Sequence, residues 1–258
     1  MAHTFQKYHG AGNDFILIDN RSGAFQPDKN VIEEMCKRRF GIGADGLMLL
    51  EEASGYDFSM RYYNSDGRES TMCGNGGRCM VAFARSLGLI DRQTTFLATD
   101  GPHQARILDD GRVSLKMQDI KEVRHHQGHD VIDTGSPHYI VWVHDPGQVR
   151  VLDEGSVIRH DPDISTDGVN VNFVTLTENR HIHIRTYERG VEDETLACGT
   201  GSVAAAISAH LRKPSDKSSY IVHALGGDLG VEFKEDEQGI FRKVWLTGPA
   251  QWVFEGKR

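Results

Sequence analysis

A Cys-Gly-x-Gly sequence occurs twice in this chain of 258 residues, and this repetition constrains the fold more than any other feature. The first copy lies in "MCGNGGRC" (Met72–Cys79) and the second in "LACGTGS" (Leu196–Ser202). The shift of 125 residues that superposes Cys73 on Cys198 also matches Tyr62 with Tyr187, Glu69 with Glu194, Gly74 with Gly199 and Gly76 with Gly201. Matches in one register indicate an internal duplication, and therefore two similar domains.

Each half of the chain combines short strands with one strongly hydrophobic helix. Apolar patterns predict strands at 15–19 and 57–63, and hairpins at 103–117 and 169–187. A helix at 30–39 is expected to bury one face, formed by Val31, Ile32, Met35 and Cys36. The most apolar helices directly follow the two Cys-Gly sequences, and the second of them is stopped by Pro214.

Antiparallel pairing dominates these patterns, so we expect an α/β (α+β) fold with two similar domains. The expected N-terminal domain covers residues 1–118 and is completed by residues 249–258. The expected C-terminal domain covers residues 119–248.

The composition is that of a globular protein, with 38% hydrophobic and 26% charged residues. A net charge of −8 disfavours a nucleic-acid partner and suits a small polar substrate. The sequence shows no leader-like start and no apolar run of bilayer length, so we expect a cytoplasmic protein without a membrane partner.

The four cysteines are expected to be free thiols, because nothing indicates secretion. Cys73 and Cys79 lack zinc-finger spacing, so a metal site built on cysteine is not expected. A structural alternative remains for Cys73 and Cys198, since many cysteines act as small buried hydrophobes at tight helix entries. The doubled pattern favours the functional interpretation.

A cysteine that begins a helix lies beside unpaired backbone N–H groups and the positive end of the helix dipole. This environment lowers the pKa of a thiol from its ordinary value of about 8.5. Adjacent glycines let a ligand approach the same N–H groups, which suit a carboxylate. One Cys-Gly corner can therefore bind a carboxylate and present a thiolate.

Two such corners across one cleft would place a sulfur on each face of the carbon that bears the carboxylate. One thiolate would remove the α-proton while the opposite thiol delivers another, and the converging dipoles would stabilise the planar intermediate. This chemistry inverts a stereocentre. It requires no pyridoxal phosphate, so we expect no cofactor and no metal.

Five sequences together resemble the diaminopimelate epimerase family over nearly the whole chain: "HGAGNDF" (His9–Phe15), "MCGNGGRC", "NVNF" (Asn170–Phe173), "YERGVEDETLACGTG" (Tyr187–Gly201) and "TGPA" (Thr247–Ala250). The resemblance implies two domains, each a curved sheet wrapped around a central helix. It also implies a homodimer that works without cofactor or metal. The implied reaction interconverts LL- and meso-diaminopimelate on the route to lysine and peptidoglycan.

The resemblance further implies roles for individual residues. Cys73 and Cys198 would be the two acid/base thiols, and His138 and Glu188 match positions that assist them. Backbone N–H groups of Gly74, Asn75, Gly199 and Thr200 would bind the reacting carboxylate. The rest of the substrate would contact polar side chains, namely Asn13, Asn64, Asn170, Glu188 and Arg189.

Two positions depart from the family pattern. Many members carry Gln where this chain has Gly46, and Asn where it has Ser136. A side-chain contact is therefore lost at Gly46, and only a shorter hydroxyl remains at Ser136.

Other binding motifs are weaker. "GIGADG" (Gly41–Gly46) fits a dinucleotide fingerprint, but it follows a predicted helix and precedes a strand, the reverse of the required order. The sequence "HHQGH" (His125–His129), and His181 with His183, could bind metal, but solvated histidines are commoner.

Two other classes of protein use paired cysteines. Proline racemase and 4-hydroxyproline epimerase resemble this family in fold, but they typically carry His after the first Cys-Gly, where this chain has Asn75. A thiol redox protein usually has its cysteines in Cys-x-x-Cys spacing, which is absent here.

Overall fold

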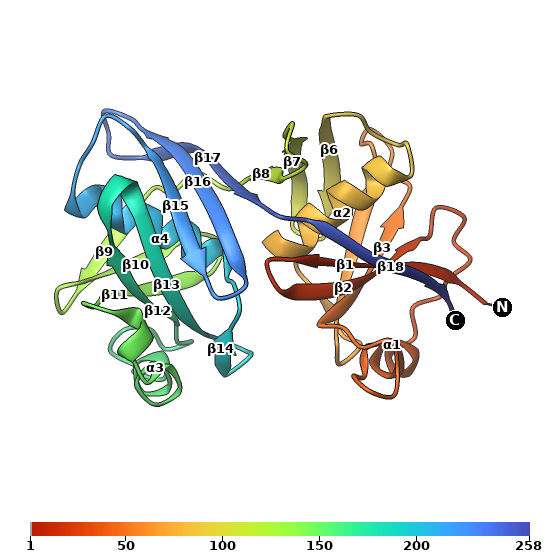
Figure 1. Ribbon diagram of the computed structural model, residues 1–258, viewed down its shortest axis with the longest axis horizontal. Coiled ribbons are helices and arrows are strands. Elements are labelled where there is room, and N and C mark those ends of the chain that lie inside the picture. Colours follow the sequence, from red (N-terminus) through yellow and green to blue (C-terminus); the bar gives the residue numbers. More distant parts are fainter. Residues whose placement is uncertain (1) are drawn as a thin grey trace. The chain divides into compact units, whose positions relative to one another are not determined.

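The protein is described by a computed structural model over residues 2–258, and it divides into two compact units. Of these described residues, unit 1 comprises residues 2–115 and Gly248–Arg258, and unit 2 comprises Lys116–Thr247. Within the described residues, each unit combines mainly antiparallel strands with two α-helices (Figure 1), which confirms the predicted fold class. No helix in this part of the chain is long and apolar enough to cross a bilayer.

Unit 1 contains β1 (Thr4–Gly10), β2 (Asn13–Asp19), α1 (Lys29–Cys36), β3 (Gly46–Glu51), β4 (Ser59–Asn64), β5 (Glu69–Ser70), α2 (Gly74–Ser86), β6 (Gln93–Ala98), β7 (Gly101–Ile107), β8 (Val113–Lys116) and β18 (Gln251–Lys257). Strands β2 and β3 pair in parallel, as do β4 and β6. The pairs β18–β1, β1–β2, β3–β4, β4–β5, β6–β7 and β7–β8 are antiparallel.

Unit 2 contains β9 (Val123–His126), β10 (His129–Asp133), β11 (Pro137–Trp142), η1 (Pro146–Gln148), α3 (Val151–Arg159), β12 (Asn170–Leu176), η2 (Glu178–Arg180), β13 (His181–Glu188), β14 (Asp193–Thr195), α4 (Gly199–Arg212), β15 (Ser219–Ala224), β16 (Gly227–Glu235) and β17 (Phe241–Gly248). Here β11–β12 and β13–β15 are the parallel pairs. The neighbouring pairs β9–β10, β10–β11, β12–β13, β13–β14, β15–β16 and β16–β17 are antiparallel.

The two units share one topology. Strands β1 to β8 correspond in order and direction to β10 to β17, and α1 and α2 correspond to α3 and α4. The pairing of β1 with β18 has its counterpart in the pairing of β10 with β9. The duplication inferred from the two Cys-Gly sequences is therefore a duplication of the whole unit.

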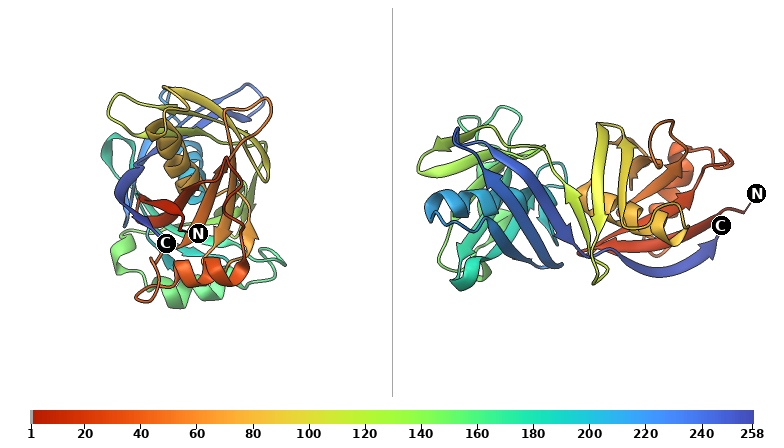
Figure 2. Two further views of the ribbon diagram at one scale, coloured as in Figure 1. Left: turned by 90° about the vertical axis from the view of Figure 1, so that its right-hand side faces the viewer. Right: turned by 90° about the horizontal axis from the view of Figure 1, so that it is seen from above.

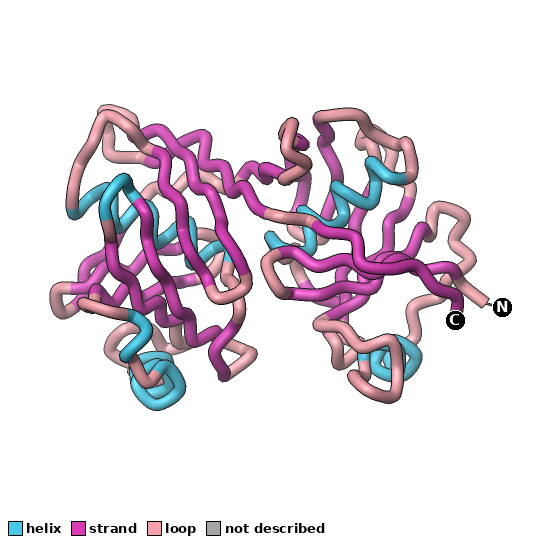
Figure 3. The backbone as a smooth tube through the Cα atoms, in the orientation of Figure 1, coloured by secondary structure: helices cyan, strands magenta, loops and turns pink. Residues whose placement is uncertain are grey.

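A buried helix forms the centre of each unit (Figures 1 and 2). Helix α2 contacts β1, β2, β3 and β7, and α4 contacts β10 to β13 and β15 to β16. In the tube drawing of Figure 3, the strands of each unit lie on several sides of its central helix. In α4 the fully buried side chains include Ala204, Ala205 and Ala206. Small side chains all round the helix allow strands to approach it from several directions.

The first helix differs from its prediction. Helix α1 ends at Cys36 rather than at Arg39, because the next residues turn back and Ile42 and Gly43 donate to the carbonyl of Met35. Its buried face consists of Ile32, Met35 and Cys36, as predicted, but Val31 is 44% exposed. Val31 precedes Ile32 by one residue and therefore points about 100° away from the buried face.

Candidate active site

Both cysteines of the repeated sequence are the N-cap residues of central helices. Cys73 precedes α2 with φ −103° and ψ 127°, and Cys198 precedes α4 with φ −110° and ψ 114°. Neither side chain caps its helix. The first-turn N–H groups have no acceptor within the helix, so each corner offers backbone donors beside a thiol. This is the local arrangement that the sequence predicted.

In unit 2 a chain of hydrogen bonds leads from the thiol into the core. Cys198 Sγ lies 3.3 Å from Thr200 Oγ1, which lies 2.9 Å from His138 Nε2. On the far side of the ring, Asn172 Nδ2 lies 3.0 Å from His138 Nδ1. Asn172 Oδ1 in turn accepts from the hydroxyl of Thr186 at 3.0 Å. His138 therefore reaches Cys198 through Thr200.

His138 has no exposed surface. Burial lowers the pKa of His138 to about 3, and the nearby positive charge of Arg189 acts in the same direction. The ring is therefore neutral at physiological pH, because neutral imidazole tolerates desolvation better than imidazolium does.

A second polar group of unit 2 surrounds Asn170. Asn170 Nδ2 donates to Ser136 Oγ at 2.7 Å, and Asn170 Oδ1 accepts from the backbone N–H of Arg189 at 2.9 Å. The guanidinium Nη2 of Arg189 lies 3.5 Å from the same Ser136 hydroxyl. Ser136, one of the two departures from the family pattern, thus links Asn170 and Arg189. Glu188 accepts a 2.7 Å hydrogen bond from Thr195 on the neighbouring strand.

In unit 1 the corner at Cys73 is supported differently. Asn75 Nδ2 donates to Asn13 Oδ1, and Asn13 Nδ2 donates to Asp45 at 3.1 Å. Asn75 Oδ1 accepts from Arg78 Nη2 at 2.7 Å. Both ends of the Asn75 amide are therefore bonded, which fixes this side chain beside the first turn of α2.

Arg78 is a fully buried cation at this corner. Its other donors reach backbone carbonyl oxygens. Nη1 donates to the carbonyl of Gly74 at 3.3 Å, and Nε donates to the carbonyl of Pro249 at 3.4 Å. Within residues 2–258 no carboxylate pairs with Arg78. A buried charge needs an opposite charge nearby, so the corner favours an anion.

The duplication relates the predicted site residues in pairs. The shift of 125 residues places His138 on Asn13, Thr200 on Asn75 and Arg189 on Asn64. Asn64 is exposed at the end of β4, as Arg189 follows the end of β13. The positions of Asn13 and Asn75, which carry two amides in unit 1, carry the imidazole of His138 and the hydroxyl of Thr200 in unit 2.

The sequence-based prediction missed Arg78, Asn172 and Thr186. Asn172 follows Asn170 by two residues on β12, so alternation already placed both on one face of the strand. Arg78 lies within the first repeated sequence, "MCGNGGRC", five residues after Cys73. Its burial depends on tertiary packing, which no local pattern reports.

Gly46, the other departure, lies where a side chain would not fit. A Cβ added there would lie 2.4 Å from Tyr62 Cε2 and 2.5 Å from the carbonyl oxygen of Tyr63. In this chain the neighbouring strand occupies that space.

The remaining cysteines are structural. Cys36 and Cys79 are buried, and burial raises the pKa of each thiol to about 12. Both stay protonated at neutral pH and are poor nucleophiles.

The weaker motifs form no ligand site in the described part of the chain. Residues 41–46 lie between α1 and β3, in the order helix then strand that disfavours a dinucleotide site. His181 contacts His223, at 2.7 Å between ring nitrogens, yet no group of three or more His, Cys, Asp or Glu side chains within residues 2–258 could hold a metal ion.

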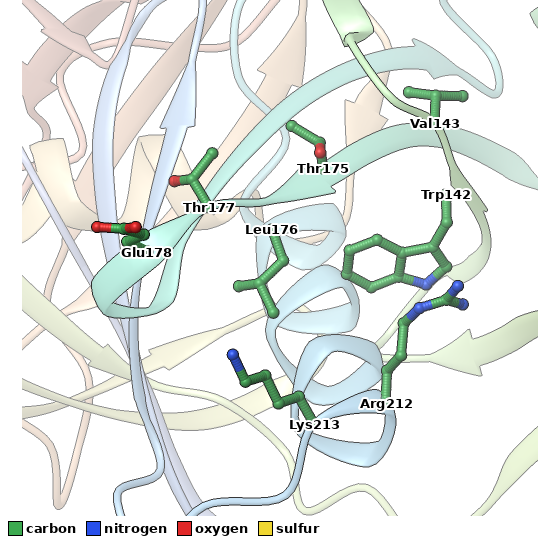
Figure 4. A pocket seen from close by; sticks show the side chains of 8 residues that line it. All are labelled: Trp142, Val143, Thr175, Leu176, Thr177, Glu178, Arg212 and Lys213. Carbon is green, nitrogen blue, oxygen red and sulfur yellow. The ribbon is translucent and has the colours of Figure 1, made fainter.

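A cavity of about 660 Å³ opens beside the C-terminal end of α4, where Arg212 lies over the ring of Trp142 (Figure 4). Its other lining residues are Val143, Thr175, Leu176, Thr177, Glu178 and Lys213. Cys198 lies at the opposite end of α4, about 20 Å away along a helix of this length. This cavity is therefore distinct from the cysteine corner.

The fold is shared with solved structures of other proteins. It is similar to a phenazine biosynthesis protein of the PhzF family from Bacillus anthracis (TM-score 0.79, 16% identity, 100% of this chain and 99% of that chain). A hydroxyproline epimerase from Agrobacterium vitis is also similar (TM-score 0.71, 14% identity, 99% of this chain and 92% of that chain). At these identities the likeness shows a shared fold.

Sequence similarity is more specific. The profile of the diaminopimelate epimerase family matches residues 5–123 and 131–253. The diaminopimelate epimerase of Flavobacterium psychrophilum is 48% identical, covering 96% of this chain and 97% of the relative. That of Chlorobaculum tepidum is 44% identical, covering 96% of this chain and 98% of the relative. The chain belongs to the diaminopimelate epimerase family, as its motifs predicted.

Proposed function

We propose that this protein is a cofactor-independent, two-base epimerase that interconverts LL- and meso-diaminopimelate in the supply of lysine and peptidoglycan precursors. One observation carries the proposal: each unit begins its central helix with a cysteine and a glycine, in a family whose named relatives are diaminopimelate epimerases. The two units supply the two bases.

The proposed mechanism brings both thiols to the α-carbon of one substrate, from opposite faces. One cysteine, as thiolate, takes the α-proton, and the other, as thiol, returns a proton to the opposite face. Negative charge then develops on the carboxylate. Backbone N–H groups of Gly74, Asn75, Gly199 and Thr200 stabilise it at the ends of α2 and α4.

The polar residues outside the corners hold the rest of the substrate in this proposal. Diaminopimelate carries a second amino-acid head, whose carboxylate needs a cation and whose ammonium needs acceptors. Arg189 suits that carboxylate because its planar fork can bind two oxygens. Asn13, Asn64, Asn170 and Glu188 complete the polar set, and His138 assists Cys198.

Substrate selectivity tests the proposal. Proline, glutamate and lysine lack the distal head, which would leave buried polar groups unpaired, so their kcat/KM should fall by about a thousandfold or more. Steady-state kinetics on LL- and meso-diaminopimelate and these three amino acids measures the difference. No turnover of diaminopimelate would refute the proposal.

A proline racemase or hydroxyproline epimerase activity is the second candidate, favoured by the structural similarity to the Agrobacterium vitis enzyme. Asn75 stands where those enzymes typically carry His. Proline or 4-hydroxyproline turned over as fast as diaminopimelate would establish it. A thiol redox activity would instead require reversible oxidation coupled to a second substrate.

We also propose a cytoplasmic homodimer. Within residues 2–258, β18 pairs with β1 along one edge. Its side chains include Trp252, Val253 and Phe254, which are 57%, 46% and 41% exposed. An apolar edge strand of this kind suits a second copy of the chain. Sedimentation velocity should give twice the monomer mass for the wild type and mostly monomer for Trp252→Glu. A wild-type monomer at micromolar concentration would refute the dimer.

A further inference from the structure

The corner at Cys198 carries a directed hydrogen-bond relay. Its members are Thr186, Asn172, His138 and Thr200, and the first three are almost completely buried, at 3%, 0% and 0% exposure. Each link is an ordinary hydrogen-bond length, from 2.9 to 3.3 Å. The direction of donation along the relay follows from the chemistry of each group.

The direction is set at Asn172. Its Oδ1 accepts from the Thr186 hydroxyl, so its Nδ2 is the atom that faces His138 Nδ1. An amide Nδ2 can only donate. Nδ1 must therefore accept, and the single proton of the neutral ring is on Nε2.

The proton on Nε2 decides the direction of the hydrogen bond between His138 and Thr200. Nε2–H donates to Thr200 Oγ1 at 2.9 Å, and the hydroxyl uses one of its lone pairs to accept. The hydroxyl hydrogen is then available for its other neighbour, Cys198 Sγ at 3.3 Å. A donor aimed at sulfur stabilises a thiolate more than a thiol.

We propose that Asn172 and Thr200 are positioning residues that fix His138 as the Nε2–H tautomer and thereby hold a hydroxyl donor on the sulfur of Cys198. The proposal concerns the same site as the proposed epimerase activity and rests on it for its biological meaning. The hydrogen-bond direction itself is independent of the substrate. In unit 1 Asn13 and Asn75 stand in place of His138 and Thr200, and the apolar side chain of Met48 faces Gly76 as Asn172 faces Gly201, so these unit 1 positions do not form an imidazole–hydroxyl relay.

The first test reads the tautomer directly. Nitrogen NMR of the full-length protein labelled with ¹⁵N-histidine should show His138 neutral, with its proton on Nε2, from pH 5 to pH 8 (about the range in which histidine ordinarily titrates). A proton on Nδ1 would overturn the proposal.

The second test reads the thiol without substrate. The pH dependence of Cys198 alkylation by iodoacetamide, followed by peptide mass spectrometry, gives the pKa of the thiol. Thr200→Val removes the donor and keeps the shape and the backbone N–H, so alkylation below the thiol pKa should slow by about tenfold. Thr200→Ser keeps the hydroxyl and should behave like the wild type, and Cys73 in the same samples is the internal control.

A double-mutant cycle separates the relay from simple charge effects. In Asn172→Asp, compared at a pH where nitrogen NMR shows the ring neutral, the carboxylate accepts from Nδ1–H, which reverses the tautomer, turns the Thr200 hydroxyl towards His138 and slows Cys198 alkylation. Adding Thr200→Val to Asn172→Asp should then cause little further slowing. A full additional tenfold loss would show that Asn172 acts by charge alone and would overturn the relay.

The outcomes of the two proposals are distinguishable. Thermal unfolding followed by circular dichroism must show that each variant is folded. An unchanged Cys198 profile in Thr200→Val would reject the relay whatever the activity is. Failure of the wild type to turn over diaminopimelate would reject the proposed function and leave the NMR and alkylation results standing.

Discussion

The two cysteine corners differ most at single residues beside the sulfur. Cys198 has a hydroxyl supported by a neutral imidazole, whereas Cys73 has a buried guanidinium at the same helix end. Arg78 is a cation placed near the positive end of a helix dipole, which is unfavourable unless an anion is present. Cys79 cannot supply it, since burial raises the pKa of that thiol to about 12. In the proposed reaction, the Cys73 thiolate and the substrate carboxylate are the anions that can pair with Arg78.

This interpretation predicts that Arg78 favours the thiolate form of Cys73. Arg78→Met should slow alkylation of Cys73 at pH 7 by about tenfold or more, since a nearby opposite charge shifts a pKa by 1–3 units. Arg78→Lys keeps the charge and should retain most of the reactivity. Cys198 reactivity should barely change. Equal Cys73 alkylation in a folded Arg78→Met variant would show that Arg78 has only a structural role.

At the scale of elements, the sequence predicted what depends on local pattern. Strand positions, the Asp110-Gly111 hairpin turn and the helices after each Cys-Gly follow from apolar periodicity, turn residues and Pro214. The boundary of α1 was wrong because hydrogen bonds from the following loop end that helix. The relay could not be predicted, since β11, β12, β13 and α4 meet only in the folded unit.

The close packing of these elements explains one glycine of the repeated sequence. A Cβ on Gly201 would lie 2.5 Å from Asn172 Oδ1 and 3.3 Å from His138 Cε1. The glycine at this position therefore lets β12 and β11 bring their side chains against the first turn of α4. In unit 1 a Cβ on Gly76 would instead lie 1.8 Å from Met48 Cε, the flexible end of an apolar side chain. The equivalent glycines Gly201 and Gly76 therefore allow close approach of a polar side chain in unit 2 and of an apolar side chain in unit 1.

At the scale of the whole molecule, duplication explains how one chain can acquire the two bases of the proposed reaction. Both units present a cysteine at the N-terminus of the central helix, and the proposed reaction needs one deprotonated and one protonated thiol at once. A duplicated unit with different supporting residues can provide two thiols in different environments. The two-base scheme is therefore the central proposal for this protein.

Isotope exchange tests that claim most directly. With LL-diaminopimelate in D₂O, the two-base scheme predicts that during the first turnovers deuterium enters the α-carbon of the meso product, while recovered LL substrate keeps its hydrogen. The reason is that the proton-donating thiol has exchanged with solvent and the proton-accepting thiol starts empty. Cys73→Ser and Cys198→Ser should each lose product formation in folded protein. Deuterium appearing in recovered substrate as fast as in product, or near-normal turnover by either serine variant, would contradict the scheme.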